Sequence, residues 1–246
     1  MNPLVPARTY VLVPLELPEP REIPTRLVEL LAPTRILLVG WYQVPEQTPP
    51  EQAREELEET GAEALEAAAR RFREAGAEVD ARHVFTPDLV DTIRRLGAEE
   101  GCDAALLSWP LGELERILVV LREEVRPRAV SRLLGDLKED DARRVTLLQI
   151  SEAEADEGRS WSDRVLEALE EEGIPTDRVE TRVETADDPG RRVLEICRDD
   201  DFDVVVVPER GEMEDRLFGS FAETVVREAH VPVLVIRGGS DEGSDG

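Results

Sequence analysis

The chain is poor in lysine, cysteine and aromatic residues, and it has no long hydrophobic run. Lys138 is the single lysine, so nearly all of the 30 basic residues are arginines. Two cysteines, Cys102 and Cys197, are too few for a disulfide framework and fit a reducing compartment. No stretch predicts a membrane span, and the first residues do not resemble a secretory signal. We therefore expect a cytoplasmic protein with mainly aliphatic cores.

Acidic residues dominate the charge of the chain. Fifty-six acidic residues against 30 basic ones give a formal net charge of -26. Such a surface repels the phosphates of nucleic acids and the headgroups of anionic membranes, so we expect neither as a partner. The acidic residues are spread through the chain amid clear apolar periodicity, which indicates a solvated acidic surface. The composition resembles that of haloarchaeal proteins. In molar salt the Debye length is about 3 Å, which screens the self-repulsion of such an acidic surface.

The apolar pattern predicts alternating strands and helices, which is typical of an α/β fold with mainly parallel sheets covered on both faces. The predicted strands are 10–15, 35–39, 79–84, 103–109, 117–121, 145–150, 178–184, 203–208 and 231–237. The predicted helices are 26–31, 50–75, one opened by Pro87, 128–137, 161–172, one opened by Pro189, and 218–230. Residues 238–246 contain only glycine, serine and acids, which predicts a disordered acidic tail.

The alternating pattern of strands and helices occurs twice along the chain. Residues 101–107, Gly-Cys-Asp-Ala-Ala-Leu-Leu, are echoed by residues 201–207, Asp-Phe-Asp-Val-Val-Val-Val. The strand at 103–109 is separated from the strand at 117–121 by too few residues for a parallel crossover, which needs a dozen or more. We therefore expect a boundary between a unit at 1–113, which lacks its last helix and strand, and a complete unit at 114–237. The exposed edge of the strand at 103–109 should be covered by the second unit or by a second chain.

The end of the second unit carries a family resemblance. Val204–Gly211 is a strand and loop, Gly219-Ser220 opens a helix, and Val231–Arg237 reads Val-Pro-Val-Leu-Val-Ile-Arg. This order resembles the C-terminal half of the universal stress protein family, in a tandem form with a truncated first domain. The resemblance implies two Rossmann-like, adenine nucleotide α-hydrolase-like three-layer units.

The resemblance also implies a nucleotide site. In one branch of the family the loop wraps the phosphates of ATP, and Gly211, Gly219 and Ser220 match its motif. Arg122 stands where that branch has an aspartate after the first strand, so Arg122 joins the candidate cofactor-binding residues. Pro208 replaces the first glycine and has no N–H to donate, and the spacer is two residues short. These departures favour nucleotide binding that is degenerate or lost, with ATP as the alternative cofactor.

Other chemistry finds little support. Ser220 to Glu223 fits a capping box, which accounts for Ser220 without a ligand. His83 and His230 have no cysteine or second histidine nearby in the sequence, so we expect no metal site. The sequence contains no serine-hydrolase elbow and no Walker loop, and we expect no catalytic residues.

The sequence therefore predicts a non-catalytic stress-response or regulatory module that acts through dimerisation. The family resemblance implies a homodimer formed by the last strand, Val231–Arg237. Two alternatives stay open at this point. One is an ATP-binding family member with slow hydrolysis, and the other is a soluble regulatory partner of a membrane transporter.

Overall fold

The computed structural model describes residues 8–43, 50–108, 115–122, 126–137, 143–151, 161–209 and 220–237. Its elements follow the predicted order closely. The strands are β1 (Tyr10–Glu16), β2 (Arg35–Gln43), β3 (Glu78–Thr86), β4 (Ala104–Ser108), β5 (Arg116–Leu121), β6 (Arg144–Ser151), β7 (Val179–Thr185), β8 (Val204–Pro208) and β9 (Val233–Ile236). The helices are α1 (Thr25–Leu31), α2 (Pro50–Glu74), α3 (Leu89–Glu99), α4 (Pro127–Asp136), α5 (Trp161–Glu171), α6 (Pro189–Asp199) and α7 (Ser220–Glu228).

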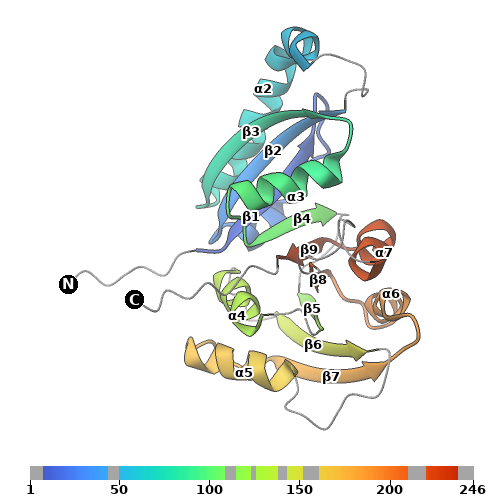
Figure 1. The fold of residues 1–246 in the computed structure, drawn as a ribbon. Helices are drawn as coiled ribbons and strands as arrows, with labels where there is room; N and C mark the ends of the chain where they lie inside the picture. The colour runs from blue at the N-terminus through green and yellow to red at the C-terminus, as the bar shows by residue number, and fades with distance from the viewer. Residues whose placement is uncertain are drawn as a thin grey trace, which may run out of the picture.

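The strands form one nine-stranded sheet in the order β3-β2-β1-β4-β9-β8-β5-β6-β7 (Figure 1). Every neighbouring pair is parallel except β4 and β9, which run antiparallel with Leu106 opposite Leu234. We call β1–β4 with their helices the N-terminal half, β5–β9 with their helices the C-terminal half, and the β4–β9 pair the joint. The predicted α/β class with a mainly parallel sheet is confirmed, and the joint makes the sheet continuous.

The pairing of β4 with β9 tests two expectations about strand edges. The hypothesis that the second unit covers β4 is confirmed, because β9 pairs with it. The prediction of a homodimer through the last strand is wrong. Both edges of β9 are occupied within the chain, one by β8 and the other by β4, so no backbone edge of β9 is left for a second copy. β4 and β5 are not adjacent, as the short connection between them required.

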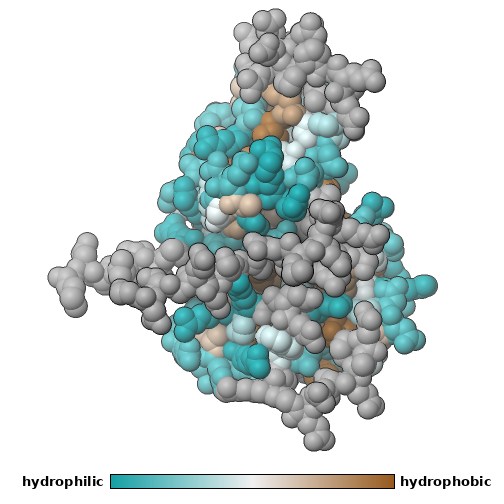
Figure 2. Space-filling model, viewed as in Figure 1, coloured by the Kyte–Doolittle hydropathy of each residue, from teal (hydrophilic) through white to brown (hydrophobic). Residues whose placement is uncertain are grey.

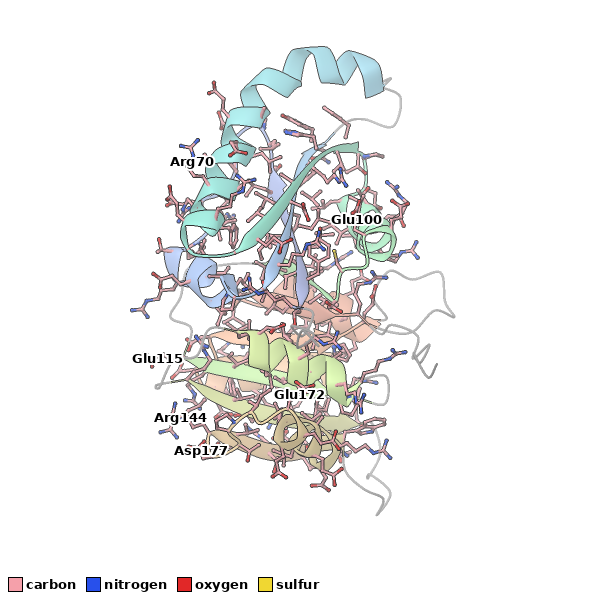
Figure 3. The ribbon with its side chains drawn as sticks, turned by 90° about the vertical axis from the view of Figure 1, so that its left-hand side faces the viewer. Arg70, Glu100, Glu115, Arg144, Glu172 and Asp177 are labelled. Carbon is pink, nitrogen blue, oxygen red and sulfur yellow. The ribbon has the colours of Figure 1, made fainter. Side chains whose placement is uncertain are left out.

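Helices cover both faces of the sheet. α1, α2, α4 and α5 pack on one face, where a single hydrophobic cluster runs across the joint through Leu106, Leu234 and Ile117. α3, α6 and α7 pack on the other face in two smaller clusters. In Figure 3, Arg70 on α2 and Glu100 just after α3 mark the opposite sides of the N-terminal half. The two halves therefore share one continuous core on the α1–α2–α4–α5 face.

The two halves repeat the same local devices. Asp103 accepts a hydrogen bond from the backbone N–H of Tyr10 at 2.8 Å, and Asp203 accepts one from the N–H of Arg116 at 2.8 Å. Asp88 and Asp188 cap α3 and α6, each accepting from the N–H three residues later. Each aspartate satisfies a backbone donor that the strand or helix itself leaves unpaired. These shared devices come from the repeated sequence pattern.

Further polar contacts tie the halves together beside the joint. Thr9 donates its backbone N–H and its hydroxyl to a carboxylate oxygen of Asp136 at the end of α4. The backbone N–H of Arg237 donates to the carbonyl of Asp103 at 2.9 Å. On the face that Figure 2 shows, hydrophilic residues predominate among the described residues, with small separate hydrophobic areas. Among the described residues no helix is long and apolar enough to cross a membrane. The predicted tail at 238–246 lies outside the described residues.

Candidate functional site

The candidate site lies in the C-terminal half, where the strand order reverses. β5 is flanked by β6 on one side and β8 on the other, and all three strands are parallel. In such sheets ligands bind in the crevice beyond the carboxyl ends of the two strands at the reversal. Here those ends are Leu121 on β5 and Pro208 on β8, and α7 begins at Ser220.

Arg122 follows the end of β5 and lies against the start of α7. Its guanidinium carbon is 4.8 Å from the centre of the Phe221 ring, and Phe221 packs against the core of α6 and α7. The structure thus brings Arg122 to the first turn of α7, where Ser220 is the first helical residue. Gly211 and Gly219 lie outside the described residues, and so does the side chain of Ser220.

The end of β8 turns toward the joint. The backbone N–H of Glu209 donates to the carbonyl of Ile236 at 2.7 Å, which extends the pairing of β8 with β9. Arg237 Nε donates to a carboxylate oxygen of Glu209 at 3.2 Å. Burial raises the pKa of the Glu209 carboxyl, and the charges of Arg237 and Arg94 oppose that rise only in part.

This ion pair was not foreseen from the sequence. Glu209 follows the motif strand directly, so on sequence position it belongs with the acids that surround the phosphate loop. In the structure its carboxylate instead accepts a hydrogen bond from Arg237. The two side chains lie beside a small cavity that α3, β1, β4 and β9 help to line. The pair follows from the parallel register of β8 and β9, which sets Pro208 opposite Ile236 and brings the next residues, Glu209 and Arg237, together.

The N-terminal half offers only part of the same arrangement. Glu16 ends β1 at the place that corresponds to Arg122, is exposed, and lies opposite Trp41 in the parallel register. The residues that follow β4, 109–114, lie outside the described part of the chain. Within the described residues, the C-terminal half is therefore the better candidate for a ligand site.

The thiols and histidines do not assemble a second centre. Cys102 and Cys197 are both buried, and burial raises the pKa of each thiol to about 12. His83 stacks near Tyr42 with 6.4 Å between ring centres. Among the residues that the structure describes, no group of three or more histidine, cysteine, aspartate or glutamate side chains could hold a metal ion.

Comparison with family models gives a match over the half of the chain that contains the crevice. The model of the universal stress protein family matches residues 113–237, which is just over half of the chain. The chain belongs to the universal stress protein family. Its matched region starts just before β5 and ends after β9, so it contains the crevice, Arg122 and α7.

Solved structures share the fold of this universal stress protein over nearly the whole chain. A universal stress protein from Archaeoglobus fulgidus aligns with a TM-score of 0.60 and 17% identity, covering 95% of this chain and 97% of its own. A functionally unknown protein from Pseudomonas aeruginosa PAO1 aligns with a TM-score of 0.53 and 15% identity, covering 94% of this chain and 93% of its own. No match was found among curated proteins.

Proposed function

We propose that this universal stress protein is a non-catalytic regulatory module in which nucleotide binding is degenerate or lost. The observation that carries the proposal is the contact between Arg122 and Phe221 at the start of α7. A guanidinium on an aromatic ring contributes roughly 0.5–2 kcal/mol, depending on how far it is desolvated. A nucleotide in the crevice would have to displace or reorient this side chain, and that cost weakens its binding.

Two further features strengthen the proposal. Pro208 has no backbone N–H, so one donor that could meet a phosphate is missing at the end of β8. The net charge of -26 opposes the approach of a polyanion, although salt reduces this effect. One feature favours the alternative of ATP binding, because a guanidinium beside a helix N-terminus can attract a phosphate.

Titration with ATP and Mg²⁺ in molar KCl tests the proposal. We expect no saturable heat of binding at nucleotide concentrations up to about 1 mM, where the binding free energy would be only about -4 kcal/mol. Gly219→Val should leave that result unchanged. Tight, saturable binding by the unaltered protein that is lost in Gly219→Val would contradict the proposal and support an ATP-binding family member.

We further propose that residues 1–113 are a truncated copy of the family unit and that residues 114–237 are a complete one. We also propose that self-association uses the outer edge of β7. Because β9 is paired on both sides, a second copy needs another edge. β7 ends the sheet at that side, and its Val183 side chain is 59% exposed. An exposed strand edge with an apolar side chain is suited to pairing with an identical edge.

The oligomeric state of single variants tests the β7 edge. We expect a dimer by chromatography with light scattering in molar KCl. Val183→Lys should be a monomer, because the lysine would be buried at the interface opposite the same lysine of the second copy, and like charges repel. Ala81→Lys places the same charge on the exposed outer strand β3 and serves as the matched control. A strict monomer for the unaltered protein, or a dimer that survives Val183→Lys, would contradict the β7 interface.

A further inference from the structure

A cavity of about 280 Å³ lies in the N-terminal half, away from the candidate crevice. It opens between the segment that precedes α1 and the C-terminal part of α2, on the side of the sheet where Figure 3 shows α2 with Arg70. Its wall is mainly apolar and includes Leu15, Ile23, Val28, Ala64, Ala68 and Phe72. The mouth carries three charged residues, Arg21, Glu22 and Arg71. The universal stress protein motif does not include any of these residues.

The cause of the cavity is visible when α2 is compared with α5. Both helices end on a glycine with positive φ, Gly76 at 106° and Gly173 at 74°. In each, the N–H after that glycine donates to the carbonyl five residues before it: Ala77 to Phe72 at 3.0 Å and Ile174 to Leu169 at 2.9 Å. These matched ends fix the alignment of the two helices residue by residue.

In this alignment two of the three alanines that line the cavity correspond to larger core residues of α5. Ala64 corresponds to Trp161, and Ala68 corresponds to Val165. Val165 is fully buried and Trp161 packs against the same core cluster. At both positions α5 therefore carries the larger side chain. An aliphatic group that covers this apolar wall removes it from water, which contributes about 25 cal/mol per Å² of apolar surface buried.

The polar contacts at the mouth are weak enough to be replaced. Arg71 lies 3.5 Å from Glu22, whose side chain is 85% exposed, and Arg71 Nη2 donates to Thr25 Oγ1 at 3.4 Å. An ion pair with so exposed a partner contributes little. With Arg21, the mouth holds two cations and one anion, which is a local positive balance in a strongly acidic chain.

We propose that this cavity binds a single-chain amphiphile, with an aliphatic tail between α2 and the segment that precedes α1, and a carboxylate on Arg71. The cavity is roughly twice the 150 Å³ apolar cavity that takes up benzene, so it suits a tail of about eight to twelve carbons. Such a site follows the usual plan of ligand pockets, an apolar body with a few polar groups that fix orientation. A planar guanidinium holds a carboxylate through two parallel hydrogen bonds.

Calorimetric titration of the full chain with decanoate in molar KCl tests the site, with 1-decanol as the uncharged probe. We expect saturable binding of decanoate at submillimolar concentration. The double variant Ala64→Trp/Ala68→Val, which takes the residues of α5, should weaken binding of both probes at least about tenfold while keeping or raising the melting temperature. Ala68→Val alone, which adds less volume, should weaken both about threefold and covers the case in which the double variant does not fold.

Arg71→Gln separates the head from the tail of the ligand. It should weaken decanoate about tenfold and leave 1-decanol unchanged, because the lost contact is to the charge. The proposal is overturned if the unaltered protein shows no saturable uptake of decanoate below about 1 mM. It is also overturned if affinity is the same in Ala68→Val, or if Arg71→Gln weakens both probes equally. The nucleotide titration uses a different site, so either result can fail without the other.

Discussion

Replacing Leu234 with alanine is expected to destabilise both halves of the protein together. Leu234 lies opposite Leu106 in the joint, and both side chains are fully buried in the cluster that crosses it. Removing a buried leucine side chain costs about 2–5 kcal/mol, from lost transfer energy and the cavity that remains. The upper part of this range is expected here, because rigid strands on both sides of β9 limit collapse around the gap.

Two tryptophans report on the halves separately. Trp41 lies on β2 and Trp161 at the start of α5, so variants that keep one of them and replace both the other and Trp109 follow one half each in urea. We expect the same midpoint for both reporters, and the same shift of both midpoints in Leu234→Ala. The measurement is tryptophan fluorescence against urea in fixed KCl.

Leu148→Ala is the matched control for the joint. Leu148 is also fully buried, but it lies on β6, which is separated from β9 by β8 and β5. If the sheet folds as one cooperative unit, Leu148→Ala lowers the midpoint reported by Trp41 as much as the one reported by Trp161. A change confined to Trp161 would show that the halves unfold independently, and the view of the joint as a shared core would be wrong.

Local pattern was sufficient to predict the elements of this fold but not the pairing that joins them. Helices and strands follow from apolar periodicity and from stops such as Gly76 and Gly173, which are properties of short segments. The need to cover β4 was also foreseeable, because the connection to β5 is too short for a parallel crossover. Which strand covers it depends on contacts between residues more than 100 positions apart, and the expected homodimer edge was wrong for that reason.

The candidate site, like the fold, was predicted only in part from the sequence. The family resemblance selected Arg122 and Ser220, and the structure places Arg122 at the first turn of α7. Gly211 and Gly219 stay predictions, because they lie outside the described residues. The partner of Glu209 was not predicted, because it depends on the exact register of β8 and β9, which sets Pro208 opposite Ile236.

Replacing Arg237 with glutamine is expected to destabilise the protein strongly at neutral pH. The Glu209 side chain is only 12% exposed and that of Arg237 is 24% exposed, so the variant leaves a buried carboxylate without its partner. Breaking a buried pair in this way costs about 3–5 kcal/mol, and the partial exposure of Arg237 places the expected loss near 2–3 kcal/mol. Arg237 Nη1 also lies 3.5 Å from the carbonyl of Cys102, so the change weakens the joint directly.

The loss should depend on pH in a defined direction. Burial holds the pKa of Glu209 above its ordinary value of 4.5 in the folded protein, so its protonated form favours folding. That contribution is fully present below pH 4.5 and is lost as the pH rises through the folded pKa. Arg237 carries a positive charge that lowers this pKa. Removing it raises the folded pKa of Glu209, so the stabilisation by protonation extends to higher pH. Urea midpoints at several pH values should show the deficit of Arg237→Gln shrinking as the pH falls from 7 toward 5.

Glu209→Gln distinguishes this account from simple loss of packing. Glutamine keeps nearly the same shape and can accept a hydrogen bond from Arg237 without a charge, so the unfolding free energy at pH 7 should stay the same or rise slightly. In the double variant Glu209→Gln/Arg237→Gln, no carboxylate is left unpaired, and most of the deficit of Arg237→Gln should disappear. A double variant that is as unstable as Arg237→Gln would mean that the stem of Arg237 against Gly97, rather than the charge of Glu209, holds the joint.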